Sequence, residues 1–393
     1  MKPIYLDHNA TTALRPEARE VWIETLQRVG GNPSSVHRSG RAARAVIDRA
    51  RERVANALGV PESGVLFTSS GTQANNLALL GTLRAAGPGS ALTVLASEHV
   101  SVLEPARHLQ SQGHELRLAP VDSQALVDAG ELAHLAHGSA LLSLAAANNE
   151  TGALAPLGQL REALDGDRVT IHTDAAQALG RIALDLSGWA VDLATLSAHK
   201  VGGPLGVGVL VRCAAQPLER VLFGGGQEEG LHPGTENAPA IAAAACAIEL
   251  AVAEQAQVAE RWKRQTSFLW DELHRALPHL QVVGPALDSP SRLPNTLTLL
   301  APGMEGRVIV TRLDLEGLEV SAGSACSSGS LEPSHVLTAM GFDEESARAA
   351  VRLSLGRETT DDELCRAVEI LSKTFSGARS EEHTSELQSH LNL

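Results

Sequence analysis

A lysine, an acid and a small-residue turn stand at positions where they could hold a cofactor and do covalent chemistry. Lys200 ends the segment 197–200, which follows a nearly apolar run and precedes Gly202 and Gly203. An isolated lysine is usually on the surface, but a lysine after such a run is less expected there. A partly desolvated lysine can form a Schiff base, so Lys200 is the first catalytic candidate.

Asp174 and the pair Gly71 and Thr72 follow two other apolar runs. Ligands bind at the carboxyl ends of strands in open α/β sheets, and the start of a helix offers free N–H groups to a phosphate. Taken alone, Asp174 or Thr72 is more simply explained as part of a helix cap. Together with Lys200, they supply a phosphate site, a Schiff-base lysine and a carboxylate that keeps a pyridinium nitrogen protonated. Pyridoxal phosphate (PLP) enzymes need all three.

His99 and Cys326 add groups that could move a proton and carry sulfur. His99 also follows an apolar run. At that edge of the sheet, an imidazole could stack on the cofactor ring and transfer protons, although by itself it would be an ordinary loop histidine. Cys326 lies in the Gly-, Ser- and Ala-rich segment 321–329, which predicts a mobile, exposed loop and a reactive thiol.

The other three cysteines, Cys213, Cys246 and Cys365, follow strand or helix patterns, and we expect them to be buried and inert. The four cysteines lie far apart without a CxxC pair. We therefore expect neither a disulfide framework nor a structural zinc site.

The elements that must position these residues alternate between strands and helices. Helical patterns span 39–58 and, without internal Pro or Gly, 240–277. The alternation predicts a mainly parallel sheet covered by helices, and the glycine-rich turn at 202–206 predicts a hairpin that adds one antiparallel strand. Beyond the long helix, further strands predict a smaller C-terminal domain. The apolar runs of strand length lie at 64–69, 91–96, 140–145, 169–173, 192–197, 207–211, 296–300 and 351–355.

Composition excludes several classes of function. The chain has 393 residues, of which 44% are hydrophobic and 20% charged, as expected of a globular protein with two lobes. A formal charge of −14 argues against a nucleic-acid partner, because phosphate backbones bind clustered Lys and Arg. The sequence shows no N-terminal apolar segment and no later stretch of membrane-spanning length. We therefore expect a cytoplasmic protein with no membrane partner.

Several motifs resemble the NifS- and IscS-type cysteine desulfurases of the class V aminotransferase family. The resemblance runs from about Ile4 to Phe375, and the Cys326 loop is similar to the long flexible loop of the first group of these enzymes. The motifs are YLDHNATT at 5–12, GNPSSVH at 31–37, FTS at 67–69, NNETG at 148–152, HK at 199–200, GTEN at 234–237 and VRLSLGR at 351–357.

The resemblance implies the PLP fold-type I architecture, which is α/β. The large domain would contain a mainly parallel seven-stranded sheet flanked by helices, and the smaller C-terminal domain would be α+β. We expect residues 1–15 to belong to the small domain, 16–255 to form the large PLP-binding domain, and 256–378 to form the small domain with the cysteine loop. Residues 379–393 match an in-frame translation of a common sequencing adapter, so we expect a disordered tail that is foreign to the natural protein.

The resemblance also assigns roles to single residues. Lys200 would form the Schiff base, Asp174 would hold the pyridinium nitrogen, and His99 would stack on the ring. Arg352 would bind the substrate carboxylate, for which a guanidinium is well suited, and Asn32 would assist in binding the substrate. The remaining cofactor contacts would come from Gly71, Thr72, Ser197 and His199 at the phosphate, from Asn149 and Gln177 at the ring oxygen, and from Thr235 at the phosphate of the other subunit of a homodimer.

The implied reaction removes sulfur from L-cysteine, giving L-alanine and a persulfide on Cys326. The sulfur would pass to an acceptor such as an IscU- or NifU-like scaffold protein, for iron–sulfur cluster assembly or another thiolation. No metal site is expected, although Cys326 could contact an iron–sulfur cluster transiently. The alternatives are a selenocysteine lyase, another enzyme of the same family, or an inactive binding subunit. Leu231-His232, where the family usually has an arginine, motivates the last of these.

Overall fold

The computed structural model describes residues 2–214, 216–301, 303–322 and 332–391. Its centre is a seven-stranded sheet with the strand order β2-β8-β7-β6-β5-β3-β4. β8 runs antiparallel to both of its neighbours, and the other pairs are parallel, which confirms the predicted sheet and hairpin. The strands are β2 (Val65–Thr68), β3 (Ala91–Leu95), β4 (Glu115–Ala119), β5 (Leu141–Ala145), β6 (Thr170–Asp174), β7 (Leu193–Ser197) and β8 (Gly208–Arg212).

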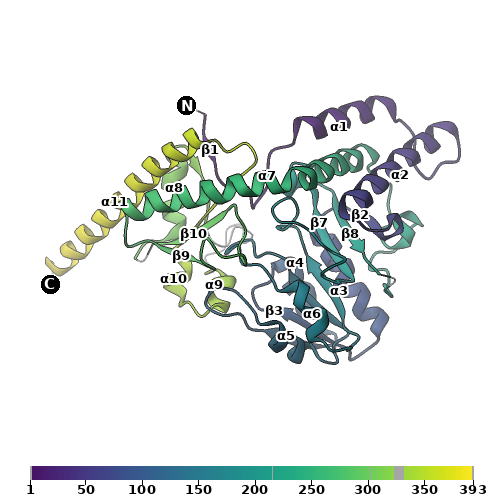
Figure 1. Ribbon diagram of the computed structural model, residues 1–393, viewed down its shortest axis with the longest axis horizontal. Coiled ribbons are helices and arrows are strands. Elements are labelled where there is room, and N and C mark those ends of the chain that lie inside the picture. Colours follow the sequence, from purple (N-terminus) through teal and green to yellow (C-terminus); the bar gives the residue numbers. More distant parts are fainter. Residues whose placement is uncertain (1, 215, 302, 323–331, 392–393) are drawn as a thin grey trace.

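Helices cover both faces of this sheet (Figure 1). Successive strand residues point to opposite faces, so Leu141 packs in the apolar cluster of α3 and α4, while Leu142 packs in that of α2, α5, α6 and α7. Burial on both faces explains why most of these strands have nearly continuous apolar sequences. The helices are α1 (Pro16–Arg28), α2 (Arg38–Leu58), α3 (Gly71–Ala86), α4 (Val100–Ser111), α5 (Ala129–Ala136), α6 (Leu157–Ala163) and α7 (Ala238–Ala276).

The sequence did not predict the edge strand β4. It follows β3 at the end of the sheet, and most of its side chains are exposed or half-buried. An edge strand with polar side chains lacks the apolar run that identifies the buried strands.

A second unit contains a four-stranded sheet with the order β12-β13-β10-β9. The N-terminal strand β1 (Ile4–Tyr5) pairs in parallel with β11 (Leu318–Glu319), and Ile4 and Leu6 are buried in the apolar core of this unit. The other elements are β9 (Gln281–Val283), β10 (Thr296–Leu300), β12 (Ser321–Ala322), β13 (Ala350–Ser354), α8 (Gly306–Leu315), α9 (His335–Ala339), α10 (Glu344–Arg348) and α11 (Asp361–Leu391).

Helix α7 connects the two units (Figure 1). Its first half, including Ile241 and Ile248, packs in the core of the large sheet, and Trp262, Leu269 and Leu273 pack in the core of the second unit. By length and composition α7 could cross a membrane, which corrects our expectation that no stretch would be long and apolar enough. Half of its most apolar window is buried, however, and a core helix of a globular protein meets the same test.

Two expectations about the C-terminal region are wrong. α11 continues to Leu391, so the expected disordered tail is helical, and its end projects from the rest of the chain in Figure 1. Residues 379–391 contain no Pro or Gly, and extending an existing helix costs far less than starting one. Cys365 on α11 is exposed rather than buried. Cys246 is buried as expected, and burial raises the pKa of the half-buried Cys213 to about 12.

Candidate active site

One cavity at the carboxyl edge of the large sheet gathers most of the predicted site residues. Strand ends and helix starts meet there, because parallel strands present their carboxyl ends at the same edge. Nine predicted residues line this cavity: Gly71, Thr72, His99, Asn149, Asp174, Gln177, Ser197, His199 and Lys200. It is also lined by Ser70, Asn75, Ser97, Ser101, Ala145, Ala147, Asn148 and Ala176.

The start of α3 forms one end of the cavity. Ser70 caps the helix by accepting a hydrogen bond from the Gln73 N–H at 3.1 Å. A Cβ atom at Gly71 would lie 3.2 Å from the Ser197 Cβ, so glycine lets the helix start approach the end of β7 closely. The N–H groups of the first helical turn lack acceptors within the helix and can bind an anion.

Lys200 lies just beyond β7 in the 3₁₀ turn Ala198–Val201. Its Nζ atom donates to the carbonyl oxygens of Asn9 at 2.6 Å and Ala10 at 2.7 Å. The N-terminal segment therefore holds the amine at the base of the cavity, between the two units of the fold.

Asp174, at the end of β6, is nine-tenths buried with 9% of its surface exposed. Its Oδ2 atom accepts from Asn75 Nδ2 at 2.7 Å, and its Oδ1 atom accepts from the Ala176 N–H at 3.0 Å. Donors on both oxygens therefore fix the orientation of this carboxyl group.

Gln177 and Asn149 lie along the same wall of the cavity. Gln177 Nε2 donates to the Asn9 carbonyl at 3.0 Å, while its buried Oε1 atom has no partner among the residues described. Asn149 contributes its carbonyl oxygen to Asn9 Nδ2 at 3.0 Å.

His99 begins α4 and is held by its own helix. Its Nδ1 atom accepts from the Ser101 N–H at 3.1 Å and lies 2.7 Å from Ser101 Oγ. Burial lowers the pKa of His99; the negative charge of Asp174 opposes this shift, and the positive charge of Lys200 adds to it. Its imidazole is therefore mainly neutral near pH 7.

A histidine beneath the cavity is neutral too. His172 lies within β6, two residues before Asp174, and is fully buried. Its Nδ1 lies 2.8 Å from Ser143 Oγ and its Nε2 lies 3.0 Å from Thr195 Oγ1, so it joins three neighbouring strands. Burial lowers the pKa of His172 to about 4.

Two buried glutamates border the site, and the sequence did not single out either as a functional residue. Burial raises the pKa of Glu98 to about 8 and that of Glu150 to about 7. Glu98 Oε1 accepts from the Ala145 N–H at 2.6 Å, whereas its buried Oε2 has no partner in the described part of the chain. Glu150 Oε2 accepts from Ser334 Oγ at 2.5 Å.

Arg352, on β13, reaches the rim of the site from the second unit. Only 1% of its surface is exposed. It donates from Nη2 to Asp7 Oδ1 at 2.7 Å and from Nη1 to the Asn149 carbonyl at 3.2 Å. Its buried Nε has no partner among the described residues.

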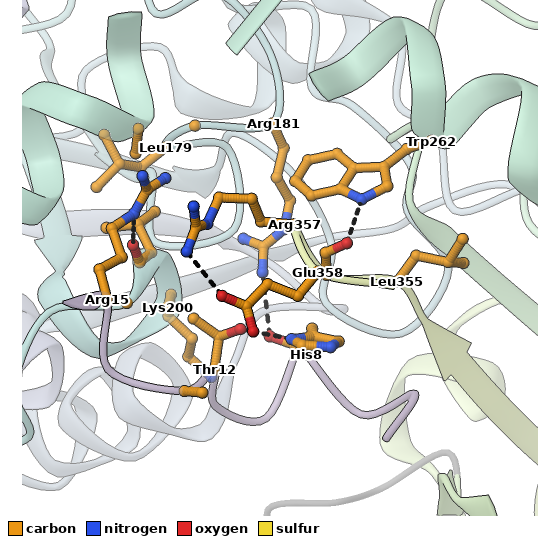
Figure 2. Close-up of a pocket in the computed structure, with 16 residues that line it drawn as sticks. His8, Thr12, Arg15, Leu179, Arg181, Lys200, Trp262, Leu355, Arg357 and Glu358 are labelled. Atoms are coloured by element: carbon orange, nitrogen blue, oxygen red, sulfur yellow. Dashed lines mark hydrogen bonds and ion pairs between the residues drawn. The ribbon is translucent and has the colours of Figure 1, made fainter. Parts of the chain in front are cut away.

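Figure 2 shows a second cavity, which shares Lys200 with the first. Arg181 is buried there and donates to the His8 carbonyl at 3.2 Å, and burial lowers its pKa to about 10. Trp262 Nε1 donates to the Gly356 carbonyl at 2.8 Å. A Cβ atom at Gly356 would overlap the His8 ring. These contacts join the N-terminal segment, α7 and the loop after β13 behind Lys200.

Three of the predicted residues that the structure describes are not among those lining the cavity, and one of them, Arg352, contacts it only through the Asn149 carbonyl. Among the described residues that line it, Asn32 and Thr235 are absent, and both are exposed. Asn32 Oδ1 instead accepts from the Ser34 N–H at 2.9 Å, which stabilises a turn. Cys326 lies outside the described residues. Leu231-His232 stands where the family usually has an arginine. The Nε2 atom of His232 lies 2.7 Å from Oε1 of Gln73, next to the start of α3.

Sequence reasoning missed Asn75, Ser101 and Glu98. Asn75 follows Gly71 by four residues, a spacing that places both on one face of α3, so the helical period could have identified it. Ser101 and Glu98 flank His99 closely in the sequence, but only the fold shows which atoms they contact.

The fold and the cavity define an α/β enzyme with a lysine, a carboxylate and a helix start around one cavity. The family model "Aminotransferase class-V" matches residues 4–366. The cysteine desulfurase IscS of Dictyoglomus turgidum is 38% identical over 96% of both chains, and IscS 1 of Archaeoglobus fulgidus is 36% identical over 96% of this chain and 98% of its own.

A solved NifS-like protein aligns with a TM-score of 0.88 and 33% identity, covering 95% of this chain and 99% of its own. The chain therefore belongs to the aminotransferase class-V family and, within it, to the cysteine desulfurases. This finding confirms the family resemblance and the fold that it implied.

Proposed function

We propose that this chain binds PLP in the cavity at the carboxyl edge of the large sheet and removes sulfur from L-cysteine. The products would be L-alanine and a persulfide on Cys326. The observation that supports this most strongly is the convergence of Lys200, Asp174 and the start of α3 on one cavity. The chain's relatives support cysteine as the substrate.

The residues present fit the cofactor. The first turn of α3, with Ser197 and His199 nearby, would hold the phosphate. Asp174 would face the ring nitrogen, and Asn149 would donate to the ring oxygen. Gln177 would donate there too after its amide turns, because its Nε2 now bonds Asn9. When bound, PLP supplies the electron sink that makes the substrate Cα–H bond acidic.

The chain's own residues would then handle protons. The amine of Lys200 must leave the Asn9 and Ala10 carbonyls to reach the substrate Cα, where it would act as the base. His99 is neutral near pH 7 and could give or accept a proton above the ring. The buried Glu98 would stay mostly protonated at that pH.

Arg352 would bind the carboxylate of the substrate. Its Nε is the buried donor that still lacks a partner, and Asp7 and the Asn149 carbonyl orient the guanidinium. A guanidinium presents a fork of donors that matches a carboxylate, and Arg352 would have to turn towards the cavity to use it, because Asp7 and the Asn149 carbonyl now hold both of its terminal nitrogens.

Cys326 would take the sulfur as a thiolate, because only the thiolate is nucleophilic. Its sulfur attacks the sulfur of the substrate, and the bond between that sulfur and Cβ breaks. The electron pair of the broken bond stays on Cβ, where a proton completes the methyl group of alanine.

The proposal includes a homodimer, in which Thr235 would reach the partner's cofactor phosphate. It also includes a cytoplasmic location and transfer of the sulfur to a scaffold protein. The exposure of Thr235 is compatible with a contact across a dimer interface.

The test is to incubate the purified chain with PLP and L-cysteine, and to measure alanine and protein-bound persulfide. Borohydride reduction followed by peptide mapping should place the cofactor on Lys200. Label on another lysine would contradict the site. Alanine release from selenocysteine alone would indicate the lyase, and a bound cofactor with no turnover of either substrate would indicate an inactive subunit.

A further inference from the structure

One asparagine joins Asp174, which the proposed function places at the ring nitrogen of the cofactor, to His99, which it places over the ring. Asn75 is fully buried on α3, with 1% of its surface exposed. Its Nδ2 atom donates both to Asp174 Oδ2 at 2.7 Å and to Ser101 Oγ at 2.8 Å. Ser101 Oγ in turn lies 2.7 Å from His99 Nδ1. A continuous line of hydrogen bonds therefore runs from Asp174 to His99.

The directions of these hydrogen bonds are determined at both ends. A carboxylate can only accept, so the amide nitrogen must face Asp174. A backbone N–H can only donate, so the bond from the Ser101 N–H shows that His99 Nδ1 presents its lone pair. Because Ser101 Oγ accepts from Asn75, its own hydrogen is free to point at the same lone pair. The proton of the neutral imidazole then lies on Nε2.

The side-chain amide of Asn75 is not fully hydrogen-bonded. Its buried Oδ1 atom has no partner in the described part of the chain. A buried acceptor without a partner disfavours folding, so a residue chosen only for stability at this position would be apolar. The two donated bonds are what distinguish asparagine from an apolar residue of the same size.

We propose that Asn75 is a positioning residue for the reaction. Its amide holds the Asp174 carboxyl in place and, by donating to Ser101 Oγ, directs the Ser101 hydroxyl hydrogen to the Nδ1 lone pair of His99, where it adds to the bond from the Ser101 N–H. This inference rests on the proposed function, since it assigns a task to residues of the same cavity. It also makes a structural claim about the protein without cofactor, which can be tested separately.

The test uses three substitutions at Asn75 and one matched control. Asn75→Leu keeps the approximate volume and removes both donors, Asn75→Ala removes volume and donors, and Asn75→Asp keeps the shape but adds a negative charge beside Asp174. The control is Asn76→Ala, because Asn76 is the next residue of the same helix and donates to the Thr72 carbonyl instead.

The first measurement is made on the protein without cofactor. Nitrogen NMR of ¹⁵N-histidine-labelled protein, with His99 assigned by a His99→Gln variant, should show Nδ1 without hydrogen in the wild type. In Asn75→Leu and Asn75→Ala this resonance should shift, because the Ser101 hydroxyl is no longer directed to Nδ1, although the bond from the Ser101 N–H remains. Asn76→Ala should give the wild-type spectrum. Unchanged His99 resonances in both Asn75 variants would overturn the proposal.

The second measurement is made with PLP bound. In Asn75→Leu and Asn75→Ala, the pH midpoint of the cofactor absorbance change should move by about one pH unit. In the same variants, kcat for cysteine should fall about 10- to 100-fold, while KM changes less than about threefold. Asn75→Asp should be worse than Asn75→Ala, because its added charge repels Asp174. If Asn75 only fills space, Asn75→Leu should keep the wild-type pH midpoint and kcat, and the proposal fails.

The two levels of inference can fail independently. A wild-type protein that binds PLP but releases no alanine from cysteine would refute the proposed function, while the NMR result would still decide the role of Asn75. A wild type that turns over cysteine, with Asn75→Leu and Asn75→Ala equal to it in pH midpoint and kcat, would refute the role of Asn75 alone.

Discussion

The buried carboxyl of Glu98 should make the protein less stable as the pH rises, and Glu98→Gln should remove that effect. Glu98 has 1% of its surface exposed, and burial raises its pKa from 4.5 to about 8. Gln has nearly the same shape as the protonated acid. It can also accept from the Ala145 N–H as Glu98 Oε1 now does.

The sign of the effect follows from which state binds the proton. Between pH 4.5 and 8 the native carboxyl keeps its proton while the unfolded one loses it, so the native state is progressively disfavoured. One pH unit corresponds to about 1.36 kcal/mol. Glu98 therefore does not lower the free energy of unfolding below pH 4.5. It lowers it by about 3 kcal/mol at pH 7 and by about 5 kcal/mol above pH 8, where the effect levels off.

The assay is urea unfolding of the wild type and Glu98→Gln at pH 6 and pH 9. The free energy of unfolding of Glu98→Gln should exceed that of the wild type, and this advantage should grow from about 2 kcal/mol at pH 6 to about 5 kcal/mol at pH 9. Other titrating groups are common to both proteins and cancel in the difference. The control is Glu104→Gln, the same substitution at an exposed position of α4, which should show no such growth. An advantage of Glu98→Gln that stays constant with pH would refute the reasoning.

Three further predictions concern the substrate, the sulfur and the chain end. Arg352→Lys keeps the charge but loses the fork of donors, so kcat/KM for cysteine should fall about 10- to 100-fold, mainly because KM rises. An unchanged KM in steady-state kinetics would contradict the proposed binding of the substrate carboxylate by Arg352. Cys326→Ser should keep the cofactor absorbance and lose alanine release, whereas Cys365→Ser on the exposed face of α11 should turn over normally; full turnover in Cys326→Ser would contradict the mechanism. Truncation after Ala378 should change the free energy of unfolding by less than about 0.5 kcal/mol in urea titrations, and a larger loss would show that the end of α11 contributes to the fold.

The positions of Lys200, Asp174 and Gly71 could be predicted because each depends on a local pattern. Each lies at the carboxyl end of an apolar run, and the carboxyl ends of parallel strands meet at one edge of a sheet. Once the alternation of strands and helices is recognised, nearness in space follows from topology. The antiparallel β8 was predictable for the same reason, since its turn is glycine-rich and adjacent in sequence.

Contacts between segments far apart in the sequence could not be predicted from local patterns. Asp7 lies 345 residues before Arg352, yet the two are 2.7 Å apart. The pKa of Glu98 depends on how completely the surrounding elements exclude water, and no local pattern gives that. Asn32 was assigned to the substrate by its motif, but the fold leaves its side chain in an exposed turn.

By itself, the sequence determined the fold class, the succession of the buried strands along the chain and the polar residues at their ends, because apolar periodicity and turn chemistry are local properties. The tertiary structure alone decided that the Asn75 amide lies between Asp174 and Ser101, that His99 presents its Nδ1 lone pair inward, and that two glutamates are buried. The physical reason is that desolvation and hydrogen-bond direction depend on atoms brought together from separate segments.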